Sequence, residues 1–136
     1  MRFAASLIGP SEAADLVSEA VVATLQRHTL SSLDNPRAYL MQAVLNRARS
    51  RARHLERERR ALARHGTKSV PDPAEVISDI TQAVAGLPPQ QRAAVFLVYW
   101  EDMVPSEAAR MLGLRPGTIR RYLHLARKRL RRLLDD

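Results

Sequence analysis

Apolar residues recur every three or four positions through most of this chain, and glycine or proline interrupts the pattern at only a few places. This spacing puts apolar side chains on one face of a helix, whereas a half-buried strand needs strict alternation. No pair of alternating segments joined by a hairpin turn competes. The sequence therefore predicts an all-α fold, and 136 residues suffice for one domain or two small helical modules.

Glycine, proline and capping residues give the expected helix boundaries. A first helix ends at Gly9 in a left-handed stop, a second runs from about Ser11 to His28, and a third begins at Pro36 with Asp34 or Asn35 as its cap and ends at Gly66. Further helices are expected over 73–85, 89–100, 105–112 and from 116 to about 134. The run from Ala93 to Trp100 is apolar on every side, and we expect a buried helix because a lone strand would leave its backbone unpaired.

The longest break in the helical pattern runs from Gly66 to Asp72 and contains Pro71. Such a segment is typical of a short tether between two modules. We therefore predict a helical module over residues 1–65, a linker over 66–72 and a second helical module over 73–136.

The charge balance points to a polyanionic partner. Lysine plus arginine number 22 and aspartate plus glutamate 14, which gives a net charge of +8. The absence of cysteine excludes disulfides and thiolate zinc sites and fits a reducing cytoplasm. No apolar run approaches the roughly 20 residues of a membrane span, and the N-terminus is too short for a signal peptide. We expect a cytoplasmic protein without a membrane partner.

Enzyme motifs are absent from the sequence. The four histidines are scattered without an HExxH pattern, and there is no glycine-rich phosphate loop, nucleophile elbow or paired-carboxylate arrangement. We therefore expect no enzyme activity, no metal or other cofactor and no small-molecule substrate.

The segment from Pro105 to Arg132 has the spacing of a helix-turn-helix, with a short helix, a turn at Gly113 and a second helix that starts at Pro116. From Arg115 to Arg132 the sequence contains no acidic residue, which suits a phosphate-lined groove. A solvated helix face is the alternative, and the helix-turn-helix frame argues against it. The best candidates for contacts with bases or phosphates are Arg120, Arg121, His124 and Lys128.

A second basic cluster extends from Arg47 to Arg64. Arg49, Arg53 and Arg60 of this cluster fall near one helix face together with Asn46, which directly precedes the cluster, and this favours a second contact with nucleic acid. A solvated face is equally compatible with the sequence, because Glu56 and Glu58 can pair with neighbouring arginines. Two basic helices in two tethered modules indicate a bipartite DNA site.

Three parts of the sequence together match the pattern of one known family. The first consists of 87–92, the apolar run 95–100, and the segments 107–114, 116–119 and 126–130. The second is Asp15, Leu16, Val17 and Glu19, and the third is the segment from Pro36 to Leu40 and on to Asn46. In this order they resemble region 4, region 2.2 and regions 2.3 and 2.4 of the extracytoplasmic-function class of bacterial RNA polymerase sigma factors.

The resemblance implies a transcription initiation factor with core RNA polymerase and promoter DNA as partners. Asp15, Leu16 and Glu19 would bind the clamp of the polymerase β′ subunit, and region 4 would bind the β flap. The −10 element would be engaged by Tyr39, Asn46, Arg49 and Arg53. The −35 element would be read by Arg115, Thr118, Arg120, Arg121, His124, Arg127 and Lys128. Members of the family are often held inactive by an anti-sigma factor.

Departures from the family pattern keep two alternatives open. Met1 to Ile8 looks like the tail of a shortened first helix of region 2, and Val104 and Arg115 stand where serine commonly caps the helices of region 4. One alternative is a free helix-turn-helix regulator that dimerises through the segment 3–22. The other is a sigma-like interaction protein that binds polymerase or an anti-sigma factor and does not open promoters.

Overall fold

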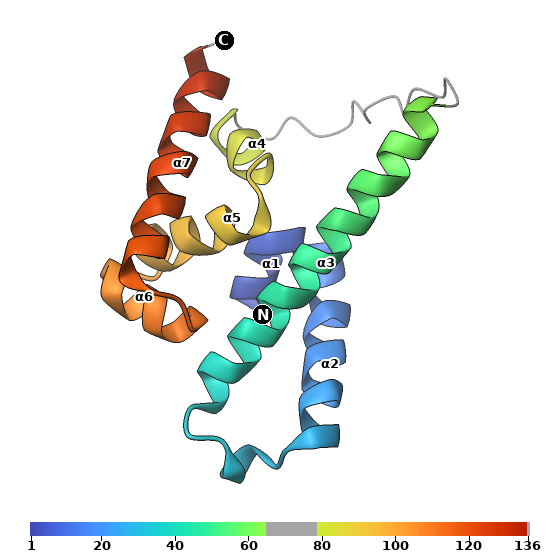
Figure 1. Cartoon of the computed structure of the whole chain (residues 1–136), viewed down its shortest axis with the longest axis vertical. Coiled ribbons are helices and arrows are strands. Elements are labelled where there is room, and N and C mark those ends of the chain that lie inside the picture. Colours follow the sequence, from blue (N-terminus) through green and yellow to red (C-terminus); the bar gives the residue numbers. More distant parts are fainter. Residues whose placement is uncertain (65–78, 136) are drawn as a thin grey trace.

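The computed structural model describes residues 1–64, here called the N-terminal half, and residues 79–135, the C-terminal half (Figure 1). Every regular element in these two ranges is helical, so the all-α prediction is confirmed. The elements are α1 (Arg2–Ile8), α2 (Pro10–Arg27), a 3-10 turn (Leu30–Ser32), α3 (Pro36–Arg64), α4 (Asp79–Ala85), α5 (Pro89–Val95), a π turn (Phe96–Trp100), α6 (Pro105–Leu112) and α7 (Pro116–Asp135). The predicted linker over 66–72 and the predicted helix start at Pro73 lie outside the described residues.

Local signals in the sequence set most of the helix boundaries. The Asn35 side chain caps α3, because its Oδ1 accepts a hydrogen bond of 3.1 Å from the backbone N–H of Ala38. Gly113 ends α6 in the left-handed conformation, with φ 67° and ψ 31°. Gly9 differs from the left-handed stop predicted for it, since its φ of 89° is combined with an extended ψ of 158°. The proline that follows at position 10 explains this ψ, because its ring excludes the helical region for the preceding residue.

A single core cluster contains buried residues from both halves of the chain. The largest fully buried side chains are Leu7 of α1, Leu16 of α2, Leu97 of the π turn and Ile119 of α7. α1 packs against α2 and α3 and also against α5 (Figure 1). At this junction the rings of Phe3 and Phe96 lie 6.2 Å apart between centroids. The short first helix therefore connects the two halves.

Some apolar residues of the helical pattern are exposed. Leu25, near the end of α2, and Leu55, in the second half of α3, are 52% and 56% exposed. Both lie beyond the stretches of α2 and α3 whose side chains enter the core. Tyr99 and Trp100 are also exposed although we predict a buried helix over this run. There the helix continues as a π turn, which rotates the last side chains away from the core.

The second half of α3 remains helical through Arg64. Ion pairs within the helix support this segment. Glu56 pairs with Arg59 at 2.9 Å and with Arg60 at 3.4 Å, and His54 lies 2.9 Å from Glu58. Such pairs, three or four residues apart, stabilise a helix even where it packs against little else. Among the helices of the described ranges, none combines the length and apolarity that a membrane span requires.

Candidate nucleic-acid interface

α6 and α7 form a helix-turn-helix in which close packing fixes the second helix. The backbone N–H of Leu114 donates to the carbonyl of Ala109 at 2.8 Å across the turn at Gly113. Ala109 of α6 is fully buried where the two helices approach each other. The buried residues of α7 are Ile119, Leu123 and Ala126, which belong to the core. The buried stripe therefore leaves the opposite face of α7 free for a partner.

Most of the candidate residues of α7 lie on its exposed surface, and Arg115 directly precedes the helix. Thr118 is partly buried, and the charged candidates are exposed: Arg115, Arg120, Arg121, His124, Arg127 and Lys128. Arg127 is held by another element, because its Nε and Nη2 donate to the hydroxyl of Tyr99 at 3.0 and 2.6 Å. Its guanidinium also lies 5.9 Å from the centre of the Tyr99 ring. Of these candidates, Arg127 alone has such a hydrogen bond among the described residues.

The four candidates in α3 fall into two groups. Tyr39 and Asn46 line a cavity of about 300 Å³ between α2 and α3, together with Thr24, Gln42 and Arg47. The ring of His28 lies edge-on to Tyr39, with 5.4 Å between centroids. This small cavity combines an aromatic ring with amide and hydroxyl groups, which is the chemistry that a single nucleobase requires.

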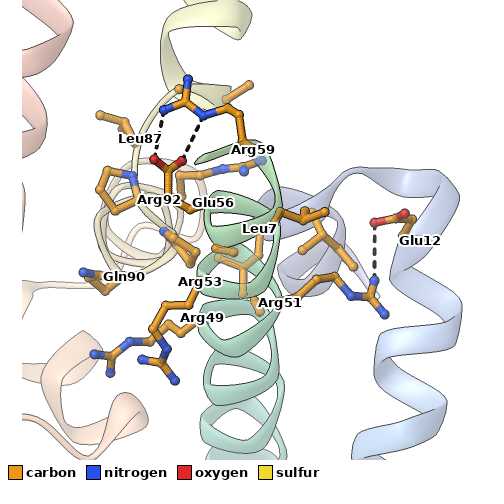
Figure 2. Close-up of a pocket in the computed structure, with 18 of the residues that line it drawn as sticks. Leu7, Glu12, Arg49, Arg51, Arg53, Glu56, Arg59, Leu87, Gln90 and Arg92 are labelled. Atoms are coloured by element: carbon orange, nitrogen blue, oxygen red, sulfur yellow. Dashed lines mark hydrogen bonds and ion pairs between the residues drawn. The ribbon is translucent and has the colours of Figure 1, made fainter. Parts of the chain in front are cut away.

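Arg49 and Arg53 line a different and larger cavity, of about 950 Å³, between α3 and α5 (Figure 2). One side chain there is already engaged within its own helix, because Nη2 of Arg53 donates to Oγ of Ser50 at 3.2 Å. The sequence places all four candidates of α3 in one site, and the structure separates them into two cavities.

The acidic candidates of region 2.2 lie on the exposed face of α2. Asp15 and Glu19 are exposed, but Leu16 is only 1% exposed and belongs to the core. Its assignment to polymerase binding is corrected, since its side chain packs inside the protein. On the same face of α2 the side chain of Val22 is exposed, a feature that the sequence analysis did not single out. It lies seven residues after Asp15, so a helical repeat starting at Asp15 could have found it.

The structure also bears on dimerisation and metal binding. The apolar side chains of the segment 3–22 that could have formed a dimerisation face, among them Phe3, Leu7 and Leu16, are buried in the core of the same chain. A free regulator that dimerises through this face would have to expose them. Within the part of the chain that the structure describes, no three histidine, aspartate or glutamate side chains gather as metal ligands.

A contact between the halves lies beside the small cavity. Nε2 of Gln42 in α3 donates to the carbonyl of Met111 in α6 at 3.1 Å. A Cβ atom on Gly113 would lie 3.0 Å from Oε1 of the same glutamine. The turn of the helix-turn-helix therefore rests on α3, an arrangement that no local sequence pattern indicates.

Residues 77–130 match the family model described as "Sigma-70, region 4". The RNA polymerase sigma-E factor of Streptomyces avermitilis is 32% identical over 140 residues, which cover 93% of this chain and 73% of the relative. The sigma-E factor of Streptomyces antibioticus is 34% identical over 135 residues, covering 93% and 72%.

A solved structure is similar over nearly the whole chain. It is the complex of the sigma factor RpoE with the anti-sigma factor NepR from Bartonella quintana. The sequence identity is 26% and the TM-score 0.64, with 98% of this chain and 88% of that chain covered. The similarity in sequence extends through both halves, and the matched region 4 contains α6 and most of α7. The chain belongs to the extracytoplasmic-function class of RNA polymerase sigma factors.

Proposed function

We propose that this sigma factor selects promoters through two separate surfaces. The free face of α7 reads the −35 element, and the small cavity between α2 and α3 holds a base of the opened −10 element. The main support for this function is the basic face of α7, which the helix-turn-helix leaves exposed to solvent.

Two features of α7 support recognition of a duplex. Arg120 and Arg121 are exposed, and an arginine fork can donate two hydrogen bonds to a guanine in the major groove. Arg115 and Thr118 stand at the start of the helix, where backbone amides and the helix dipole favour a phosphate. His124 and Lys128 extend the same exposed face by two turns. Arg127 would bind phosphate once released from Tyr99.

The small cavity supports recognition of a single strand. An extruded base can stack on an aromatic ring and form hydrogen bonds through its edge with amides. Tyr39 supplies the ring, and Gln42 and Asn46 supply the amides. Arg49 and Arg53 lie one and two turns further along α3 and would contact phosphates of the same strand.

Protein partners complete the proposed function. Asp15 and Glu19 would bind the polymerase clamp, with Val22 as an apolar contact beside them, and the C-terminal half would bind the β flap. The solved relative from Bartonella quintana is in complex with an anti-sigma factor, which supports a partner of that kind for this chain as well.

Binding to core RNA polymerase tests the first step. We expect the purified chain to co-elute with core polymerase at physiological salt, and Asp15→Arg to abolish co-elution. Glu58→Arg is the matched control, because it reverses one exposed charge on α3 outside the proposed docking surface. If Asp15→Arg and Glu58→Arg reduced co-elution equally, the proposed docking surface on α2 would be wrong. Co-elution without promoter opening would support the alternative of a sigma-like interaction protein.

Binding to duplex DNA tests the reading surface. We would select duplexes with the wild-type chain from a random pool and measure affinity against salt concentration. Arg120→Ala or Arg121→Ala should weaken binding by about 1 to 3 kcal/mol where the side chain contacts a base. Arg131→Ala removes the same charge from an exposed position near the end of α7 and should cost less. Unchanged affinity and salt slope in both test variants would refute the assignment of α7.

A further inference from the structure

The cavity between α3 and α5 has an unusual lining. Its volume is about 950 Å³, and α1 and α7 contribute to its edges (Figure 2). Arginines from both halves of the chain line it: Arg49, Arg51, Arg53, Arg57, Arg59, Arg60, Arg92 and Arg129. The acidic side chains in the lining are Glu12 and Glu56. The cavity therefore carries a large excess of positive charge.

Both glutamates are already paired with arginines of the lining. Glu12 lies 3.3 Å from Arg51, and Glu56 pairs with Arg59 and Arg60. Hydrogen bonding from Arg59 lowers the pKa of Glu56 below its ordinary value, so this carboxylate is charged at neutral pH and fully engaged. No ion pair within the described residues neutralises the remaining arginines of the lining, which are Arg49, Arg53, Arg57, Arg92 and Arg129.

Among these five arginines, Arg92 is the one whose surroundings lack hydrogen-bond acceptors most clearly. Its Nε is shielded from solvent and has no hydrogen-bond partner, and the adjacent Gln91 has an unpaired buried Oε1. Burial lowers the pKa of the Arg92 guanidinium, because desolvation penalises the charged form. A shielded donor without an acceptor is costly, and an anion in the cavity would contact the part of Arg92 that lines it.

The remaining walls favour a small ligand. Leu7, Ile8, Leu87 and Pro88 form an apolar part of the lining. Apolar walls reduce the local dielectric and strengthen hydrogen bonds between guanidinium groups and an anion. The volume falls within the range of about 300 to 1,000 Å³ that is typical of sites for small molecules.

We propose that this cavity binds a free oligophosphate, a small anion with several linked phosphate groups. Arginine forks match phosphate oxygens in geometry and charge, and several forks in one cavity favour a multivalent anion. Because α3 lies on one side and α5 on the other, the ligand would fasten the two halves together. It would also occupy Arg49 and Arg53, and so compete with promoter DNA for them. Binding itself does not depend on the proposed promoter contacts.

Titration of the full chain with inorganic tripolyphosphate tests the proposal. We expect saturable binding at physiological salt, and only weak binding of orthophosphate. Arg53→Ala, an exposed change, and Arg92→Lys, which keeps the charge but removes the fork, should each weaken binding about tenfold. Glu56→Gln should strengthen binding, since it releases Arg59 and Arg60. Arg110→Ala is the control for charge, because this exposed arginine of α6 lies outside the cavity lining, and affinity should stay within about twofold.

Thermal unfolding gives a second readout. Tripolyphosphate should raise the midpoint of the wild-type chain as its concentration passes the dissociation constant, and should have little effect on the double variant Arg53→Ala/Arg92→Lys. Absence of binding, or equal weakening in Arg110→Ala, would overturn the proposal. Tighter binding of a single-stranded oligonucleotide with the same variant pattern would also overturn it, by assigning the cavity to a nucleic-acid backbone. None of these readouts uses polymerase or promoter duplex, so failure here is distinguishable from failure of the proposed function.

Discussion

Gly113 occupies a position that no other residue type fits without strain. Its backbone is left-handed, with φ 67°, and the space where a Cβ would lie is filled by the side chain of Gln42. We predict that Gly113→Ala destabilises the protein by about 1 to 2 kcal/mol, mainly through the backbone conformation. Urea unfolding followed by circular dichroism measures this loss.

A second glycine in the same motif provides the control. Gly117 lies in the first turn of α7, and the nearest atom to an added Cβ is Nη2 of Arg120 at 4.0 Å. Gly117→Ala should therefore be neutral or slightly stabilising. Equal destabilisation by both substitutions would contradict the special role of Gly113. The Gln42→Ala background separates the two causes, since it removes the crowding and leaves the backbone strain.

For single residues, the sequence predicts the contacts that depend on near neighbours in the chain. The cap by Asn35 is foreseen because its partner is three residues away. The contact between Gln42 and Met111 spans 69 residues, and no local pattern encodes it. The error at Leu16 has the same origin, because family resemblance assigns a role to a segment, whereas packing decides which side chain of that segment is exposed.

Among the elements, α6 is the one whose boundaries are predicted best. It runs from Pro105 to Leu112, as the proline at its first position and the glycine after its end indicate. The preceding helical segment ends at Trp100, as predicted, but its last five residues form a π turn, which has no comparable sequence signal. Periodicity also could not predict that Tyr99 and Trp100 are exposed, because the run in which they lie is apolar on every side of the helix.

The start of α6 lacks a side-chain cap. Val104 occupies the N-cap with extended backbone angles, makes no capping hydrogen bond and is 54% exposed. Serine commonly stands at this position in the family that the sequence resembles. We predict that Val104→Ser stabilises the protein by about 1 kcal/mol, because its hydroxyl can accept a hydrogen bond from a free amide of the first turn. The midpoint of thermal or urea unfolding measures the gain.

Val104→Ala is the matched control for the lost valine side chain. It removes the same apolar atoms and adds no acceptor, so it should give no stabilisation. If Val104→Ala stabilised the protein as much as Val104→Ser, the gain would come from removal of the exposed valine side chain and not from capping. If Val104→Ser were no more stable than Val104→Ala, another group would already accept the hydrogen bonds of these amides.

For the whole molecule, α3 is the element that both cavities share. It forms one wall of the small cavity with α2 and one wall of the arginine-lined cavity with α5. Composition alone predicts a polyanionic partner from the net charge of +8, and periodicity predicts the helices. Neither predicts that α1 packs against α5, so neither could place arginines of both halves around one cavity.

The packing of α1 against both halves makes a prediction about cooperativity. The only tryptophan of the chain, Trp100, lies in the C-terminal half and reports on its unfolding, while circular dichroism reports on all helices. Phe3 is buried against Phe96. We predict that Phe3→Ala lowers stability by about 3 to 5 kcal/mol, with the loss visible at Trp100 as well as in circular dichroism.

Comparison of the two probes decides whether the halves unfold together. Leu25→Ala serves as the control, since this exposed leucine of α2 should change stability by no more than about 0.5 kcal/mol. If Phe3→Ala shifted the circular dichroism transition and left the Trp100 transition in place, the halves would unfold independently and the shared core would contribute little to the C-terminal half. Coincident shifts of both probes are expected, because the buried side chains of α1, α5 and the π turn belong to one core cluster.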